Sequence, residues 1–162
     1  MLKKIHLIII SILFITIISS CKKDSNGNLI IPGLNTSMSA KVNNVDWSSA
    51  VRVCTKSNNT ITLTGTSADG QIITLTISPT LATDSLNTTS TYSLSLTTLY
   101  KLSATASAND IYAATSGSAK FTQLDKTQKL ISGTFSFTGL NSSLAALAIT
   151  AGTFSNVSYV GN

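Results

Sequence analysis

The chain has 162 residues, a net charge of +5, no glutamate and a single histidine, His6. Its basic residues are spread out, which excludes the clustered Lys and Arg of a nucleic-acid-binding face. Ser and Thr make up about a third of the chain after residue 20, and Thr together with Val, Ile, Phe and Tyr favours strands over helices.

Residues 1–20 have the pattern of a secretory signal peptide. Lys3 and Lys4 supply positive charge, and a mostly apolar stretch follows from Ile5 to Ile18. This stretch is shorter than the roughly 20 apolar residues of a transmembrane helix, which favours a cleaved leader. Cleavage would lower the net charge by two, to +3.

The leader ends in Ile18-Ser19-Ser20-Cys21, which resembles the lipobox of bacterial lipoproteins: an aliphatic residue, two small residues and a cysteine. The resemblance implies cleavage between Ser20 and Cys21, a diacylglyceryl group on the Cys21 thiol, and acylation of the new amine by a fatty acid such as palmitate. Each buried methylene contributes about 0.8 kcal/mol, so several chains anchor firmly. The alternative is an ordinary secretory signal that happens to end at a cysteine.

Residues 21–36, which include the lipidated cysteine, have the composition of a tether. Asn26-Gly27-Asn28 and Pro32-Gly33 are turn signals. Lys22-Lys23 would lie beside the lipid, where each lysine near an anionic surface contributes about 1 kcal/mol; two solvated lysines are the alternative. Leu29-Ile30-Ile31 is too apolar for a solvated linker, so we expect this segment to pack on the domain.

Residues 37–162 are expected to form a single domain in which apolar and polar residues alternate with the period of two typical of strands. We expect strands, in chain order, at residues 38–42, 49–55, 60–66, 73–77, 92–96, 111–115, 118–124, 130–138 and 147–159. Turns or loops are expected at residues 43–44, 67–70, 80–90, 103–109, 125–129 and 141–146.

The hairpin of residues 118–138 has the clearest alternation, with Ile131, Gly133, Phe135 and Phe137 on one face and Ser and Thr on the other. The Thr-rich outer faces suggest one solvated face per sheet, which antiparallel sheets tolerate. We therefore expect an all-β fold, an antiparallel β-sandwich or a flattened barrel, with mostly meander connections and little helix. Periodicity does not separate the two forms, because inward and outward residues alternate in both.

Several segments resemble a family of Bacteroidetes lipoproteins of unknown function. Residues 116–141, SGSAKFTQLDKTQKLISGTFSFTGLN, and 149–159, ITAGTFSNVSY, carry its C-terminal ISGTFSF and ITxGxF strands. MSAKVNNVDW at 38–47 and TYSL at 91–94 are similar to its opening and middle strands, although Val45-Asp46 stands where a glycine is expected. The resemblance spans most of residues 36–160. The resemblance supports the predicted fold and the predicted membrane compartment, but it identifies no catalytic residues.

The sequence excludes much catalytic chemistry. With His6 in the leader, the mature chain has no imidazole for general-base catalysis, for a Ser or Cys triad or for zinc. It has no nucleophile-elbow, Ser-x-x-Lys or phosphate-cradling glycine motif. We expect no metal, no cofactor and no enzymatic activity. An aspartate-based hydrolase is the remaining enzymatic alternative and would require two aspartates within about 10 Å in a cleft.

Three residues of the domain are candidates for a special role. Cys54 lacks a partner, which favours a buried small hydrophobe over a reactive thiol. Trp47 is either a core residue or a platform for ligand stacking. Asp84-Ser85-Leu86 is similar to the short O-glycosylation acceptor of exported Bacteroidetes proteins, which makes Ser85 a candidate acceptor in a loop.

The sequence therefore predicts a non-enzymatic lipoprotein of the outer membrane, anchored through Cys21, with a binding or structural accessory role. Lys22 in place of Asp after the cysteine argues against retention in the inner membrane. The alternative is a glycan- or ligand-binding surface protein of an uptake system. The partner, the oligomeric state and the membrane face, periplasmic or external, stay open.

Overall fold

A computed structural model describes residues 22–23, 29–30, 36–81 and 84–161. The chain divides into two units, residues 1–34 and 35–162. In the first unit β1 (Lys22–Lys23) and β2 (Leu29–Ile30) form a short antiparallel pair. The described part of the chain includes neither Ser20 and Cys21 nor the side chains of Leu29-Ile30-Ile31. Cleavage, lipidation and packing of the tether on the domain therefore stay predictions.

The second unit is all-β, which confirms the predicted fold class. Within the described residues its only helical element is the three-residue 3-10 turn η1 (Ala108–Asp110), and none of these residues forms a helix long and apolar enough to cross a bilayer. Its strands are β3 (Ser37–Val42), β4 (Val45–Ser48), β5 (Val51–Ser57), β6 (Thr60–Thr66), β7 (Ile72–Ile77), β8 (Tyr92–Ser93), β9 (Leu99–Lys101), β10 (Ile111–Asp125), β11 (Leu130–Leu140), β12 (Ala146–Ser158) and β13 (Val160–Gly161).

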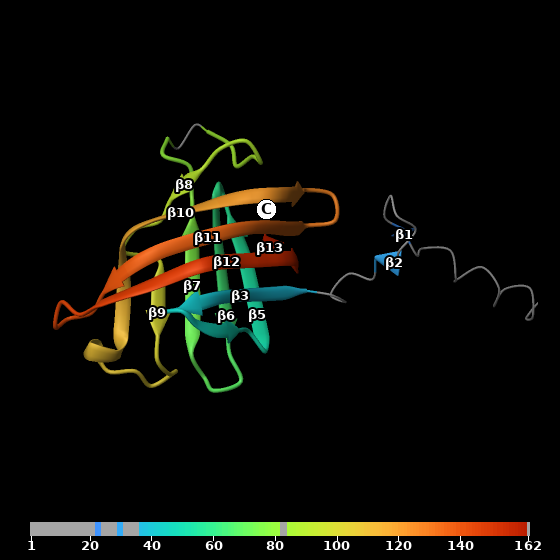
Figure 1. Ribbon diagram of the computed structural model, residues 1–162. Coiled ribbons are helices and arrows are strands. Elements are labelled where there is room, and N and C mark those ends of the chain that lie inside the picture. The colour runs from blue at the N-terminus through green and yellow to red at the C-terminus, as the bar shows by residue number, and fades with distance from the viewer. Residues whose placement is uncertain (1–21, 24–28, 31–35, 82–83, 162) are drawn as a thin grey trace, which may run out of the picture. The chain divides into compact units, whose positions relative to one another are not determined.

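These strands form one sheet with the order β13-β5-β6-β7-β9-β10-β11-β12-β3-β4, and β8 pairs with β10. Neighbours are antiparallel, mostly joined as a meander, except that β13 pairs with β5 in parallel. The sheet folds into two layers, with β5, β6, β7 and β9 running across β10, β11, β12 and β3 (Figure 1). It is not closed into a barrel, so the architecture is sandwich-like.

Strand β10 joins the two layers, and here the predicted elements differ from the structure. The expected separate strands at residues 111–115 and 118–124 are one strand, which pairs with β9 near its start and with β11 along its length. The register with β11 shifts between Ala114 and Ser116 and again between Phe121 and Gln123. Such bulges bend a strand and increase its twist, and bent strands form the corners of packed sheets.

The inward-facing residues of both layers form one hydrophobic core. Phe121, Phe135, Phe137 and Phe154 are buried in it, which confirms the inward face predicted for Phe135 and Phe137. The alternation predicted for residues 92–96 holds for Tyr92 and Leu94, which are buried, but not for Leu96, whose side chain is 69% exposed. The chain turns at this point, because the Thr98 amide donates to the Ser95 carbonyl oxygen at 2.7 Å.

Candidate functional site

Trp47 lies in the core rather than on an open surface. Its side chain on β4 is 4% exposed, and its indole Nε1 is buried without a hydrogen-bond partner among the described residues. Eight of the nine aromatic residues from 47 to 159 are buried, and Tyr112 is half-buried. The described part of the chain therefore offers no open aromatic face on which a sugar ring could stack.

Cys54 is buried in β5 and forms no disulfide. Burial raises the pKa of its thiol to about 12, so the side chain is a neutral thiol at physiological pH. The thiolate is the nucleophilic and metal-binding form of cysteine. The position therefore matches the prediction of a small buried hydrophobe.

Ser85 is exposed on the loop between β7 and β8. The loop is attached to the domain on both sides of it: Asn59 Nδ2 donates to the Asp84 carbonyl oxygen at 2.8 Å, and the Leu86 side chain is buried. Further along, the Tyr92 hydroxyl accepts from the Asn87 amide at 2.7 Å. The predicted acceptor thus lies on an accessible but attached segment.

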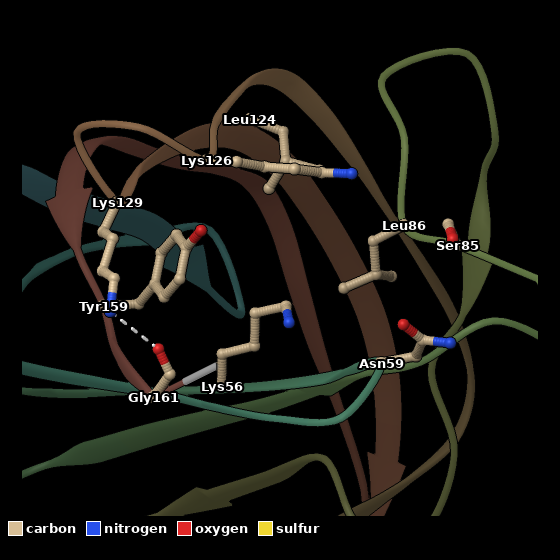
Figure 2. A pocket seen from close by; sticks show the side chains of 9 residues that line it. All are labelled: Lys56, Asn59, Ser85, Leu86, Leu124, Lys126, Lys129, Tyr159 and Gly161. Atoms are coloured by element: carbon tan, nitrogen blue, oxygen red, sulfur yellow. Dashed lines mark hydrogen bonds between the residues drawn. The ribbon is translucent and has the colours of Figure 1, made fainter.

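Next to Ser85 lies a hollow that the sequence did not predict, which we call the lysine pocket. It has a volume of about 260 Å³ and is lined by Lys56, Asn59, Ser85, Leu86, Leu124, Lys126, Lys129, Tyr159 and Gly161. Figure 2 shows Lys56 and Lys126 extending toward the space beside Leu86, with Lys129 beyond the Tyr159 ring. Three positive side chains and an apolar wall thus share one small cavity.

Three chain segments position these lysines. Lys56 belongs to β5, immediately before the turn to β6. Lys126 and Lys129 belong to the β10–β11 turn, in which the Asp125 carboxylate accepts from the amides of Thr127 and Gln128 at 2.8 and 2.7 Å. An aspartate that bonds the backbone two and three residues ahead is typical of a tight turn. Lys129 completes this turn in the left-handed region, at φ 55°.

The C-terminal segment closes one side of the lysine pocket. The Lys129 ammonium donates to the Gly161 carbonyl oxygen at 2.9 Å, which attaches β13 to the β10–β11 turn. Burial of the phenol is the main cause that raises the pKa of Tyr159, and the nearby Asp125 and Cys54 raise it further. The phenol therefore keeps its proton and is able to donate a hydrogen bond.

A second hollow lies at the opposite end of β6 and is polar. Its volume is about 420 Å³, and Asp46, Asp69, Trp47 and Tyr100 are among its lining residues. The Asp46 carboxylate accepts a hydrogen bond from Lys41 at 2.7 Å and its side chain is 88% exposed. A catalytic acid is usually kept protonated by burial, and neither aspartate is buried.

The same hollow is a poor candidate for a metal centre. Within the described ranges, no group of three or more His, Cys, Asp or Glu side chains could hold a metal ion. Two solvated carboxylates, one of them in an ion pair, do not favour the hydrolase alternative. The lysine pocket is therefore the stronger candidate site.

The chain matches the model of one protein family. A family model described as a domain of unknown function, DUF6252, matches residues 34–158. The chain belongs to the DUF6252 family. The match lies close to the span of residues 36–160 expected from the sequence resemblance. Neither the comparison with curated proteins nor that with solved structures finds a match.

The loop position of Ser85 in this DUF6252 domain was predicted from the sequence, but the lysine pocket beside it was not. The only available signal was that Lys56, Lys126 and Lys129 all lie in turns or at strand ends. Turn lysines are ordinary solvated residues in most domains. Only the pairing of β5 with β13 and the β10–β11 hairpin bring these three together.

Proposed function

We propose that this DUF6252 chain is a non-enzymatic lipoprotein of the bacterial outer membrane whose β domain binds a small ligand in the lysine pocket. The anchor is supported by the lipobox-like Ile18-Ser19-Ser20-Cys21 and by the resemblance to Bacteroidetes lipoproteins. Lys22 after the cysteine supports the outer rather than the inner membrane.

The observation that carries the binding role is the composition of the lysine pocket. Ligand sites combine apolar walls with a few polar groups that fix orientation. Here Leu86 and Leu124 supply the wall, and Lys126 and Tyr159 add polar groups. Nothing in the cavity acts as an activated nucleophile, because the Ser85 hydroxyl has no imidazole near it in a chain whose only histidine is His6.

Blocking the cavity tests this role. Ser85→Trp would place a large ring at its rim, and we expect it to abolish binding of fragments that the parent protein binds there. Ligand-observed NMR with a library of neutral and charged fragments measures this, using the full chain from a heterologous host. Thr88→Trp is the matched control, because Thr88 is exposed on the same loop and does not line the pocket.

The fragment-binding result either supports or contradicts the binding role. Fragments that compete for one site, are lost in Ser85→Trp and are kept in Thr88→Trp support the binding role. A parent protein that binds no fragment, or fragments that bind Ser85→Trp equally well, would contradict it.

We also propose that Ser85 is O-glycosylated in the native host. Its exposure in an attached loop between Asp84 and Leu86 supports this. Intact-mass analysis of protein from that host should show a glycan mass that disappears in Ser85→Ala and persists in Ser90→Ala, a serine of the same loop. An unmodified native peptide containing Ser85 would refute the idea.

A further inference from the structure

The second hollow, which we call the tryptophan pocket, is lined by a residue with an unpaired buried donor. The Trp47 indole N–H is buried and has no hydrogen-bond partner among the described residues. The benzo end of the ring packs against β6, where a Cβ on Gly65 would lie 2.9 Å from Trp47 Cη2. The ring is therefore fixed and cannot turn its N–H toward another acceptor. Leaving a buried donor unpaired costs free energy, so an acceptor that reaches this N–H is stabilised.

A second unpaired hydroxyl borders the same pocket. Tyr100 on β9 is buried and lines the pocket, and its hydroxyl makes no hydrogen bond with the residues that the structure describes. Burial is the main cause that raises the pKa of Tyr100, and the neighbouring Tyr112 raises it further, so the phenol keeps its proton. A smaller hollow also borders Trp47, but Tyr100 does not line it. Only the tryptophan pocket therefore brings both donors to one ligand.

Two carboxylates stand at the rim of the tryptophan pocket. Asp46 and Asp69 line it and are exposed, and Asp46 pairs with Lys41 at 2.7 Å. Asp69 belongs to the β6–β7 turn, in which the Ser67 amide donates to the Gln71 carbonyl oxygen at 2.8 Å and the Gln71 amide donates to the Ser67 hydroxyl at 3.0 Å. Ionised carboxylates only accept hydrogen bonds. The pocket thus combines buried donors with acceptors at its rim.

This combination restricts the chemistry of a ligand. The two carboxylates repel an anion, and the N–H and O–H donors do not suit a metal ion. A hydroxyl group both donates and accepts, so neighbouring hydroxyls of one neutral molecule can satisfy the donors and the carboxylates together. The volume of about 420 Å³ corresponds to about fourteen water molecules at about 30 Å³ each. That space accommodates a sugar ring but not a folded partner.

We infer that the tryptophan pocket binds a small uncharged polyhydroxyl compound, such as a monosaccharide, through an oxygen that accepts from Trp47 and Tyr100 and hydroxyls that donate to Asp46 and Asp69. Recognition is by hydrogen bonds and not by ring stacking, which agrees with the burial of the aromatic rings. The tryptophan pocket shares no lining residue with the lysine pocket. The inference therefore goes beyond the proposed function and is independent of it.

The single tryptophan of the chain provides a direct reporter of this binding. Its indole N–H gives one resonance in a proton–nitrogen correlation spectrum of the full chain. We expect glucose, galactose or mannose to shift this resonance in a saturable manner. Glucuronate carries a carboxylate on the glucose ring. At low salt, where charges are least screened, it should bind at least about tenfold more weakly than the best neutral sugar, because Asp46 and Asp69 repel it.

Removing single polar groups locates the bound sugar. Tyr100→Phe removes only a hydroxyl and Trp47→Phe removes the N–H donor, so each should raise the Kd of the sugar by about tenfold in isothermal titration. Tyr112→Phe is the matched control: its ring centroid lies 6.2 Å from that of Tyr100, but Tyr112 does not line the pocket, and the Kd should change by less than about twofold. Thermal melts check folding, and Tyr100→Phe keeps the test decisive if Trp47→Phe destabilises the domain.

The outcomes separate this inference from the proposed function. If none of the three neutral sugars moves the indole resonance, water alone meets the Trp47 donor and the inference fails. Equal affinity for glucuronate, an unchanged Kd in Tyr100→Phe or an equal loss in Tyr112→Phe would also overturn it. Sugar binding that Ser85→Trp abolishes and Tyr100→Phe leaves intact would place the ligand in the lysine pocket, which would support the proposed function and refute this inference.

Discussion

Replacing Cys21 by serine should release the protein from the membrane fraction. A hydroxyl cannot form the thioether that holds the diacylglyceryl group, so the variant would carry no acyl chain. Each buried methylene contributes about 0.8 kcal/mol, and stable anchoring takes more than one chain. Loss of all chains should therefore change the partition between membrane and soluble fractions by several orders of magnitude. Fractionation, palmitate labelling and intact-mass analysis measure this.

The second cysteine of the chain provides the matched control. Cys54 is buried in β5 with a neutral thiol, so Cys54→Ala should leave the protein in the membrane fraction with its acyl mass intact. A parent protein that retains residues 1–20 and lacks acyl groups would contradict the lipoprotein proposal. Protease treatment of whole cells then decides the membrane face: degradation indicates external display, and protection indicates the periplasmic side.

Replacing Phe154 by alanine should lower the free energy of unfolding by about 4 kcal/mol, as expected for Phe to Ala in a packed core. Phe154 on β12 is 1% exposed; its ring centroid lies 6.0 Å from that of Phe121, edge-on, and 6.4 Å from that of Phe135. The ring occupies space that Gly133 leaves open on β11, because a Cβ there would lie 2.5 Å from Phe154 Cζ.

Urea denaturation followed by circular dichroism measures the loss. Since small domains have only about 5–15 kcal/mol of stability in total, the variant should unfold at a much lower urea concentration. Leu96→Ala is the control: this side chain is 69% exposed, and its removal should cost less than about 0.5 kcal/mol. A Phe154→Ala variant as stable as Leu96→Ala would show that the aromatic layer is not the stabilising core described above.

The parts of the fold that were predicted depend on local pattern. The β10–β11 hairpin follows from strict alternation, since Gly133, Phe135 and Phe137 all point inward. The sequence predicts a break at residues 116–117, because Ser and Gly are typical of loops, whereas in the sheet these two residues continue the bulged strand β10. The alternation of Tyr92, Leu94 and Leu96 predicts a strand as far as residue 96, but the strand ends at Ser93, because alternation does not reveal where a strand ends.

The sequence by itself determined the lipobox-like Cys21, the absence of histidine beyond His6 and the strand-forming composition, because these depend on residue identity and on the order of neighbours. Only the tertiary structure decided that Trp47 is buried, that the sheet stays open, and that Lys56, Lys126 and Lys129 meet at one cavity. The reason is physical: burial and charge clustering depend on which segments pair when they are far apart in the sequence. The pairing of β13 with β5 is an example, and no local sequence pattern predicts it.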